Sequence, residues 1–391
     1  MADEWRTIRL GEVAQINPDA IDLAWPYSNI QYIDISSVGV GQIQTPPQRM
    51  ELSDAPSRAK RLVRGGDTVL STVRPNRRSM FFASEPADDW VVSTGFAVLR
   101  PDTRLVHPRF LYACVFNQAF TEYLITREKG AAYPAVSPED IANAEIPYPP
   151  LKDQQAIACI LGALDDNIEL NRRMNQTLEA IAQAIFKSWF VDAIRNGLPE
   201  GWQYGTLRDA IAIHDSKRIP LSGRQRAERQ GKYPYYGAAS VMDYVDDFLF
   251  DGVYVLIGED GSVVNDDDSP VLQYVWGKFW VNNHAHVLTG QNGISVEHLF
   301  LFLQTVNIRP FITGAVQPKL NQGNLCRIPF TLPPESVNQG FARLVEPLFA
   351  RIRANDEQSS TLAALRDALL PKLISGELRV PDAERIVERC A

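Results

Sequence analysis

An internal repeat constrains this chain more than any other feature, because a pattern that occurs twice predicts one fold made twice. Both halves open on tryptophan, leucine and isoleucine at one spacing, 197 residues apart: Trp5, Leu10 and Ile16, then Trp202, Leu207 and Ile213. Both halves close alike at an offset of 184 residues: Gly130, Pro134, Ile141, Pro149 and Pro150, then Gly314, Pro318, Leu325, Pro333 and Pro334. The sequence therefore predicts two related modules.

After each double proline the pattern becomes helical. Apolar residues recur every seven positions around a central asparagine: Ile157, Leu164, Asn171, Leu178 and Ile185, then Phe341, Leu348, Asn355, Leu362 and Leu369. This spacing predicts two long, coiled-coil-like helices, which can pair antiparallel about a pseudo-two-fold axis. We expect Asn171 and Asn355 to lie close together in the seam and to fix its alignment. The alternative is two unrelated amphipathic helices, each packed on its own module.

Each module shows a mixed α/β pattern. Short apolar strands around Val69-Leu70 and Val255-Leu256 are followed by apolar helices around Phe110-Leu111 and Leu299-Phe300. The predicted organisation is a module, a helix, a second module, a second helix and a tail: 1–150, 151–195, 196–334, 335–378 and 379–391. The fold class is therefore mixed α+β, with two α/β modules separated by two long helices.

Composition excludes several classes of protein. A chain of 391 residues with 45% hydrophobic residues predicts two or three folded domains. The net charge of −8 argues against a generally basic DNA binder, so any basic surface must be local. No apolar run is long enough for a membrane span and the N-terminus lacks a signal-peptide pattern, so we expect a cytoplasmic protein. The four cysteines form no CxxC pair, which argues against a zinc knuckle.

Several ordered motifs resemble one family, the specificity subunits of type I restriction-modification systems. The motifs span nearly the whole chain: Ser71–Asn76, Pro149–Leu151, Gln154–Ile157, Leu164–Ile168, Leu198–Trp202, Tyr235–Gly237, Asn282–His284 and Lys372–Leu378. The resemblance implies two target recognition domains, each reading one half of a bipartite, asymmetric sequence in duplex DNA. It also implies that the helices hold them apart and recruit two modification (methyltransferase) subunits, with restriction/translocase subunits completing the complex. S-adenosylmethionine, ATP and Mg are then expected on the partner subunits, and no cofactor or metal on this chain.

Two basic stretches are the candidate DNA contacts. In the first module, Arg58, Lys60, Arg61 and Arg64 suit phosphate, and Arg74, Asn76, Arg77 and Arg78 follow a strand where arginine and asparagine can read bases. In the second module, the candidates are Lys217, Arg218, Arg224, Arg226, Lys232, Tyr235, Tyr236 and Lys319. The bland alternatives are solvated loops for the cations and core positions for the tyrosines.

The loop after the matched strand in the second module is Gly258-Glu259-Asp260-Gly261-Ser262, which lacks the basic residues of its counterpart. Different loops on one scaffold are expected to read different bases. His284 and His286 alternate on a predicted strand and therefore share a face, which is compatible with metal binding. We expect no metal there, because the sequence shows no third ligand.

Enzymatic activity has little support in the sequence. There is no Walker loop, no glycine-rich turn typical of S-adenosylmethionine binding and no adenine-extrusion motif, since Tyr148 precedes Pro149-Pro150 where such a motif needs a polar residue. We therefore predict a non-catalytic subunit. The competing hypothesis is an adaptor whose helices pair partner proteins without DNA.

Overall fold

The computed structural model describes residues 5–22, 24–130, 133–314 and 317–390. The chain divides into two compact units, one formed by Met1–Glu169 with Ser359–Ala391 and the other by Leu170–Gln358. Unit 1 is thus made from both ends of the chain, whereas unit 2 is continuous. In the part of the chain that the structure describes, no helix combines the length and apolar character needed to cross a membrane.

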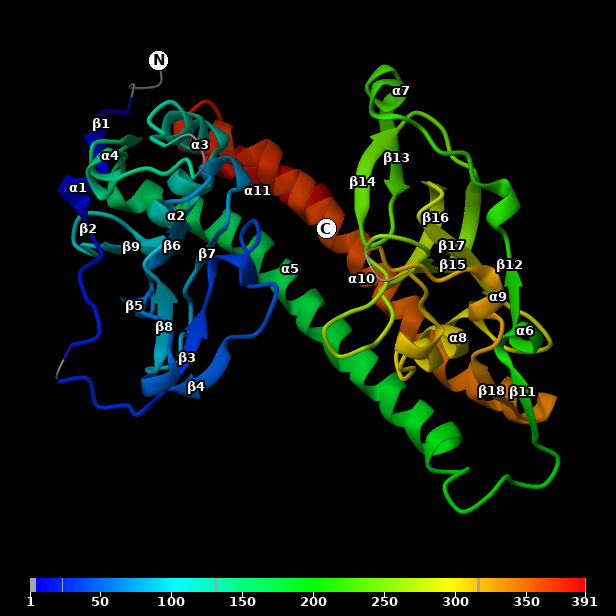
Figure 1. Ribbon diagram of the computed structural model, residues 1–391. Helices are drawn as coiled ribbons and strands as arrows, with labels where there is room; N and C mark the ends of the chain where they lie inside the picture. The colour runs from blue at the N-terminus through cyan, green and yellow to red at the C-terminus, as the bar shows by residue number, and fades with distance from the viewer. Residues whose placement is uncertain (1–4, 23, 131–132, 315–316, 391) are drawn as a thin grey trace. The chain divides into compact units, whose positions relative to one another are not determined.

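Unit 1 contains two four-stranded sheets (Figure 1). One sheet has the order β2-β9-β6-β7, with bounds Ala14–Ile16, Phe96–Pro101, Thr68–Ser71 and Met80–Phe82. The other has the order β4-β3-β8-β5, with bounds Gln48–Glu51, Asn29–Ile33, Trp90–Ser93 and Ala59–Leu62. The helices are α1 (Leu10–Val13), α2 (Pro108–Phe116), α3 (Gln118–Ile125) and α4 (Pro138–Ala142), and β1 (Thr7–Arg9) pairs with β10 (Glu145–Pro147).

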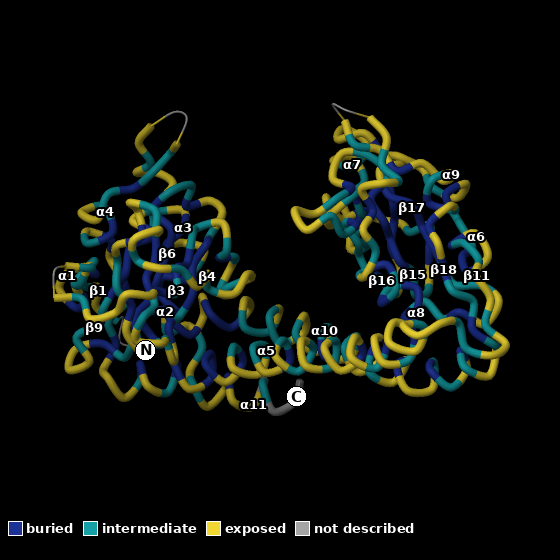
Figure 2. Tube along the Cα trace, turned by 60° about the horizontal axis from the view of Figure 1, so that its bottom comes forward, coloured by how far each residue is buried: buried dark blue, intermediate teal, exposed yellow. Residues whose placement is uncertain are grey.

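Unit 2 is built around one six-stranded sheet, of order β12-β17-β15-β16-β13-β14. The strands are Ile211–Ile213, Ala285–Gly290, Phe250–Gly258, Leu272–Val281, Gln230–Tyr236 and Val241–Val245. The helices are α6 (Leu207–Ala210), α7 (Gly223–Glu228), α8 (Val296–Leu303) and α9 (Gln322–Leu325), and β11 (Gln203–Thr206) pairs with β18 (Pro329–Leu332). In Figure 2 strands β15 and β17 are buried, while the α7 end of the unit is exposed.

The two modules close with the same backbone hydrogen bond. In unit 1 the amide of Leu10 donates to the carbonyl of Ala144 at 2.8 Å, and in unit 2 the amide of Leu207 donates to that of Ile328 at 2.8 Å. These four residues obey the offsets of 197 and 184 seen in the sequence. The repeat is therefore a repeat of structure, and the predicted mixed fold with two modules is confirmed.

The long helices are α5 (Leu151–Phe186), which continues as a π-helical segment over Lys187–Val191, and α10 (Glu335–Ser375). Gly376, with φ +76, ends α10, as a left-handed residue commonly does. In unit 1, Asp165 of α5 meets Arg366 of α10. Helix α11 (Val380–Cys390) follows.

In unit 2 the same two helices contact each other through amides. Asn171 donates to the carbonyl of Asn355 at 3.4 Å and to the side chain of Gln358 at 3.1 Å, and Asn355 donates to Asn175 at 2.7 Å. Further along, Phe186 packs on Phe341. Contacts that advance along α5 retreat along α10, so the helices are antiparallel, as the sequence predicts.

Candidate nucleic-acid interface

The loop after β6 holds the first group of predicted base contacts. Arg74 and Arg78 have φ values of 50° and 53°, a left-handed conformation that is uncommon for residues other than glycine, and they flank the short helical turn Pro75–Arg77. The amide of Arg74 donates to the carbonyl of Pro134 at 2.8 Å, which fixes the turn. Asn76 and Arg77 are exposed at its tip.

The two flanking arginines of this loop lie against aromatic rings. Arg74 lies 5.6 Å from the ring centre of Tyr133, a residue that is itself 74% exposed. Arg78 lies over Phe116 at 4.9 Å and donates to the carbonyl of the same residue. Arg78 therefore anchors the loop to α2, whereas Asn76 and Arg77 remain accessible.

The stretch predicted to contact phosphate lies at and around β5. Arg58 pairs with Asp34 at 2.9 Å and Arg64 with Asp19 at 2.7 Å, and the side chains of both arginines are more than half exposed. The side chains at the remaining two positions differ, because Lys60 is exposed and Arg61 is half-buried. Burial lowers the pKa of the Arg61 guanidinium, because a charged group loses favourable hydration when it is buried.

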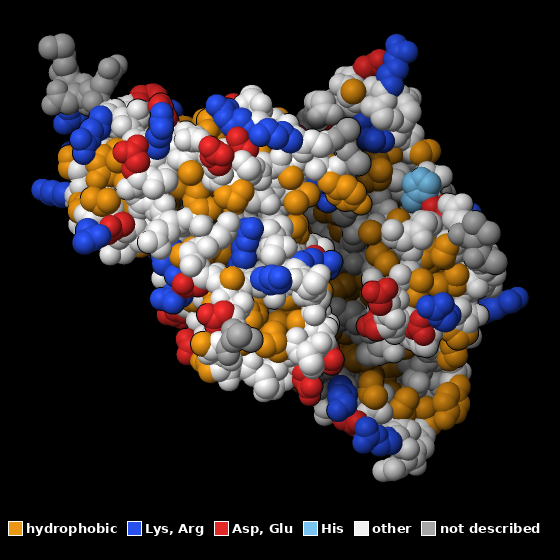
Figure 3. Space-filling model, turned by 60° about the vertical axis from the view of Figure 1, so that its left-hand side comes forward, with side chains coloured by type: hydrophobic (Ala, Val, Ile, Leu, Met, Phe, Trp, Pro, Cys, Tyr) orange, Lys and Arg blue, Asp and Glu red, His pale blue; other side chains and the backbone are white. Residues whose placement is uncertain are grey.

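In unit 2 the basic stretch surrounds α7, which begins at a capping box between Ser222 and Gln225. Three of its predicted contacts are exposed: Lys217, Arg224 and Lys232. Arg226 is more enclosed, since it pairs with Asp243 at 3.1 Å. On the face of the molecule shown in Figure 3, basic side chains likewise lie among acidic ones.

The two tyrosines beside this stretch lie inside the module. Tyr235 is 1% exposed, and its hydroxyl accepts a hydrogen bond from the amide of Leu221 at 2.9 Å. Tyr236 is half-buried and packs edge-on against Phe279. Of the two alternatives for these tyrosines, DNA contact or core position, Tyr235 therefore has the core position.

Behind the predicted contacts of unit 2 lies a cluster of charges that the sequence did not reveal. Asp215, Glu259 and His286 place ligand-type atoms within 4.8 Å of one another. His284, the other histidine of the strand, instead faces Asp260. Arg218 also belongs to the cluster and donates to Glu259 at 2.8 Å.

Existing partners occupy this cluster. Nδ1 of His286 lies 2.6 Å from Asp215, and its Nε2 lies 2.7 Å from the carbonyl oxygen of Leu320. A guanidinium between the two carboxylates supplies the positive charge that a cation would otherwise bring. The arrangement is therefore an ion-pair network. Lys319, the last predicted contact, is half-exposed and lies 3.7 Å from Glu259.

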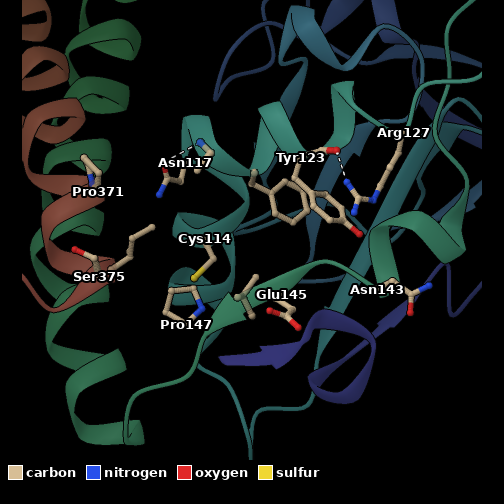
Figure 4. A pocket seen from close by; sticks show the side chains of 13 residues that line it. Cys114, Asn117, Tyr123, Arg127, Asn143, Glu145, Pro147, Pro371 and Ser375 are labelled. Carbon is tan, nitrogen blue, oxygen red and sulfur yellow. Dashed lines mark hydrogen bonds between the residues drawn. The ribbon is translucent and has the colours of Figure 1, made fainter. Parts of the chain in front are cut away.

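Unit 1 also contains a pocket of 460 Å³ between α3, β10 and the end of α10 (Figure 4). None of its lining residues is among the predicted DNA contacts. Its thiol, Cys114, is buried, and this burial raises the pKa of the thiol, so that it stays protonated and is a poor nucleophile. The pocket therefore gives no support to an enzyme.

Local sequence could not identify every residue near these loops. Tyr133 lies about 60 positions from Arg74, and Asp215, Glu259, His286 and Gln322 are spread over more than 100 positions. No motif spacing links residues so far apart. The duplicated glycine and proline, Gly130 with Pro134 and Gly314 with Pro318, are the signal in the sequence that these two segments are equivalent.

Comparison with known proteins gives a consistent family. The model of the type I restriction modification DNA specificity domain matches residues 2–180 and 199–363. The type I restriction enzyme MjaIX specificity subunit of Methanocaldococcus jannaschii is 26% identical over 345 residues, which cover 81% of this chain and 78% of that protein. The HindI specificity subunit of Haemophilus influenzae is 24% identical, over 96% of this chain and 100% of that protein.

A solved structure has a similar fold. The S subunit of a type I restriction-modification system from M. genitalium has a TM-score of 0.57 at 16% identity. The alignment covers 96% of this chain and 97% of that one. Two copies of one domain, matched in sequence and in fold, account for the repeat.

Proposed function

This chain belongs to the type I restriction-modification DNA specificity family, and we propose that its two modules read the two halves of one bipartite, asymmetric sequence in duplex DNA. It is a specificity subunit and not itself an enzyme. In this proposal, residues 1–150 and 196–334 are the two target recognition domains. The helices of residues 151–195 and 335–378 separate them, and residues 379–391 are the C-terminal tail.

One observation carries the proposal: equivalent backbone hydrogen bonds anchor a different loop in each of the two modules. The amide of Val136 donates to the carbonyl of Thr72 at 2.9 Å, and the amide of Leu320 donates to that of Glu259 at 2.8 Å. Beyond these equivalent anchors, the first module exposes Asn76 and Arg77, whereas the second exposes Gly261 and Ser262. A common scaffold with chemically different tips suits the reading of two different half-sites.

The exposed residues divide by the DNA groups that they suit. Asn76 and Arg77 can form paired hydrogen bonds with adenine and guanine in the major groove. Contacts between cations and phosphate position the duplex and make binding salt-sensitive. The exposed cations suited to such contacts are Lys60, Lys217, Arg224, Lys232 and Lys319. Arg58, Arg64 and Arg226 can contact phosphate by exchanging their carboxylate partners.

The same proposal includes the partners. Members of this family assemble with methylase and restriction subunits, and we propose that the two long helices of this chain recruit two modification subunits. S-adenosylmethionine, ATP and Mg would then be bound by those subunits and not by this chain. The adaptor hypothesis without DNA is not favoured, because it gives no reason for two modules that anchor chemically different loops by equivalent backbone hydrogen bonds.

The test uses this chain assembled with its modification subunits. Asn76→Ala and Arg77→Ala should each reduce discrimination at one base pair of one half-site, by about 1–3 kcal/mol. Binding to duplexes with every base pair substituted in turn measures the effect. Arg104→Ala is the matched control, because Arg104 is 86% exposed and lies on a turn away from this loop. A uniform loss across both halves would contradict direct reading by these residues.

A further inference from the structure

We infer that the buried network of Asp215, Arg218, Glu259 and His286 is a positioning device for the second module, with His286 held as a cation at its centre. The inference rests on the proposed function, because it assigns these residues to holding the reading loops of that module. They are positioning residues, since they act through exposed residues of the segments that they join.

The hydrogen bonds of His286 determine its charge. The residue is 0% exposed, and its two ring nitrogens face Asp215 and the carbonyl oxygen of Leu320. A carbonyl can only accept, so Nε2 carries a proton. Nδ1 carries one too if Asp215 is ionised, which makes the ring an imidazolium.

The contacts of Asp215 show that it is ionised. One of its oxygens accepts from the amide of Val287 at 2.9 Å, and the other accepts from Gln322 at 2.6 Å as well as from His286. Burial raises the pKa of this carboxyl, but the bonds from His286, Val287 and Gln322 together lower it below its usual value. Two carboxylates thus balance two cations inside the module.

The network joins three surface segments that are distant in sequence. Arg218 belongs to the basic stretch and donates both to Glu259 and to the carbonyl of Ala285 at 2.6 Å. Glu259 belongs to the loop after β15, and its backbone carbonyl accepts a hydrogen bond from the amide of Leu320, the residue after Lys319. One buried cluster therefore fixes all three segments.

The segments joined by the network carry residues that are exposed to solvent. Lys217 precedes Arg218 and is exposed, and Lys319 precedes Leu320 and is half-exposed. Asp260 follows Glu259 and contacts His284, whose side chain is 48% exposed. A displacement of the network would move Lys217, Lys319 and the loop that contains Asp260, so it would change which bases and phosphates these segments reach.

Among its described residues, the first module has no such network at the equivalent place. The register of β6 with β9 pairs Leu70 with Ala97, and that of β15 with β17 pairs Ile257 with His286. Ala97 therefore stands where the second module has His286, and it is fully buried. The difference offers a variant that copies a natural solution: His286→Ala.

The experiment measures methylation by the chain assembled with its modification subunits, on duplexes substituted at each base pair. His286→Ala should lower discrimination in the second half-site at least tenfold, while discrimination in the first half-site stays within twofold as an internal control. His286→Gln, which can donate to only one of the two acceptors, should be intermediate. Asp215→Asn combined with His286→Ala removes the unpaired carboxylate and should still lack discrimination, although it folds like the parent protein.

A second measurement tests the charge directly. In the full chain labelled with ¹⁵N-histidine, both ring nitrogens of His286 should show protonated chemical shifts at pH 7. A neutral ring, unchanged discrimination in His286→Ala, or an equal loss in both half-sites would each overturn the inference. Absence of two half-sites in the parent complex would instead contradict the proposed function, so the two failures are distinguishable.

Discussion

The two units attach a module to the same pair of helices by different chemistry. In unit 1, Asp165 of α5 pairs with Arg366 of α10 at 2.8 Å, and Arg109 of α2 pairs with Asp166 at 2.7 Å. The Arg366 guanidinium also lies 4.5 Å from the ring centre of Phe116. This junction therefore depends on partly buried ion pairs.

Unit 2 has apolar residues at the equivalent positions. The offset of 184 residues that relates the double prolines also relates Asp165 to Phe349 and Arg366 to Ala182. Ala182 and Phe349 are 0% and 2% exposed and belong to one cluster with Phe186, Phe190 and Phe341. The two helices therefore meet at equivalent positions in both units, through an ion pair in unit 1 and through apolar side chains in unit 2.

The difference shows that a helix–module junction can tolerate either solution, provided that no charge is left alone. Replacing a buried ion pair by well-packed apolar residues is often neutral or stabilising, whereas removing one partner is costly. Unit 2 is not free of ions, because Arg353 donates to Tyr274 and lies 3.5 Å from Glu297. Its ions, however, lie at the edge of the aromatic cluster.

The largest expected effect comes from breaking the ion pair of unit 1. Arg366→Ala should destabilise that unit by about 3 kcal/mol, because it leaves Asp165 largely buried without its partner. Burial already raises the pKa of Asp165 despite the hydrogen bond from Arg366. Hydrogen exchange along residues 151–169 measures the local free energy of opening.

The matched variant copies unit 2. Asp165→Phe with Arg366→Ala reproduces Phe349 and Ala182, and we expect its stability to lie within about 1 kcal/mol of the parent protein. If the double variant is as unstable as Arg366→Ala alone, the two junctions are not interchangeable.

The next effect concerns pH and separates the units further. His298 is buried among the rings of Phe190, Phe341 and Phe330, and this burial lowers its pKa to about 3. Below about pH 6.5 His298 therefore binds a proton in the unfolded chain, whereas in the folded chain it stays neutral until the pH approaches 3. The contribution of His298 to the free energy of unfolding is therefore fully present above about pH 6.5 and is lost as the pH falls toward 3. At pH 5 about 2 kcal/mol of it has been lost.

Asp165 has the opposite sign, because its pKa is raised in the folded state. Its contribution favours the folded state at low pH and declines as the pH rises, so it does not weaken unit 1 in acid. Acid should thus loosen α10 residues 341–349 more than residues 366–373. His298→Leu should remove about 2 kcal/mol of the difference between pH 7 and pH 5, and an unchanged difference would contradict the assignment. Hydrogen exchange at both pH values measures this.

The repeat was enough to predict the broad fold. Leu10 and Leu207 occupy equivalent places because one amphipathic pattern recurs, and the antiparallel helices follow from the heptads around Asn171 and Asn355. Such patterns are local or periodic, so a single sequence can carry them. The mixed α/β modules were predictable for the same reason.

Exposure of the basic residues was not predictable. Arg77 and Arg78 are neighbours, yet one is exposed and the other is turned to Phe116, 38 positions later in the chain. Charge alone does not say which partner a guanidinium will find. Likewise, the partners of His286 come from segments whose proximity is created only by the sheet.

The smallest effect tests whether one detail of the junction is really shared. Gln154 and Asn338 are related by the offset of 184, and both bind the carbonyl of the first proline of the double proline that precedes their helix. Gln154 donates to Pro149 at 2.9 Å and also accepts from the amide of His107 at 2.9 Å. Asn338, one methylene shorter, reaches Pro333 only at 3.5 Å, and its buried oxygen has no hydrogen-bond partner among the described residues.

Apolar replacements of similar shape should therefore behave differently in the two units. Gln154→Met leaves a buried amide and a buried carbonyl unpaired, so it should destabilise unit 1 by about 1–2 kcal/mol. Asn338→Leu loses one long hydrogen bond but also removes an unsatisfied oxygen, so it should change the stability of unit 2 by less than about 0.5 kcal/mol. Urea denaturation of both variants, with hydrogen exchange to assign each transition to its unit, measures the difference. Equal losses would mean that Asn338 has the same role as Gln154 and that the shorter side chain costs nothing.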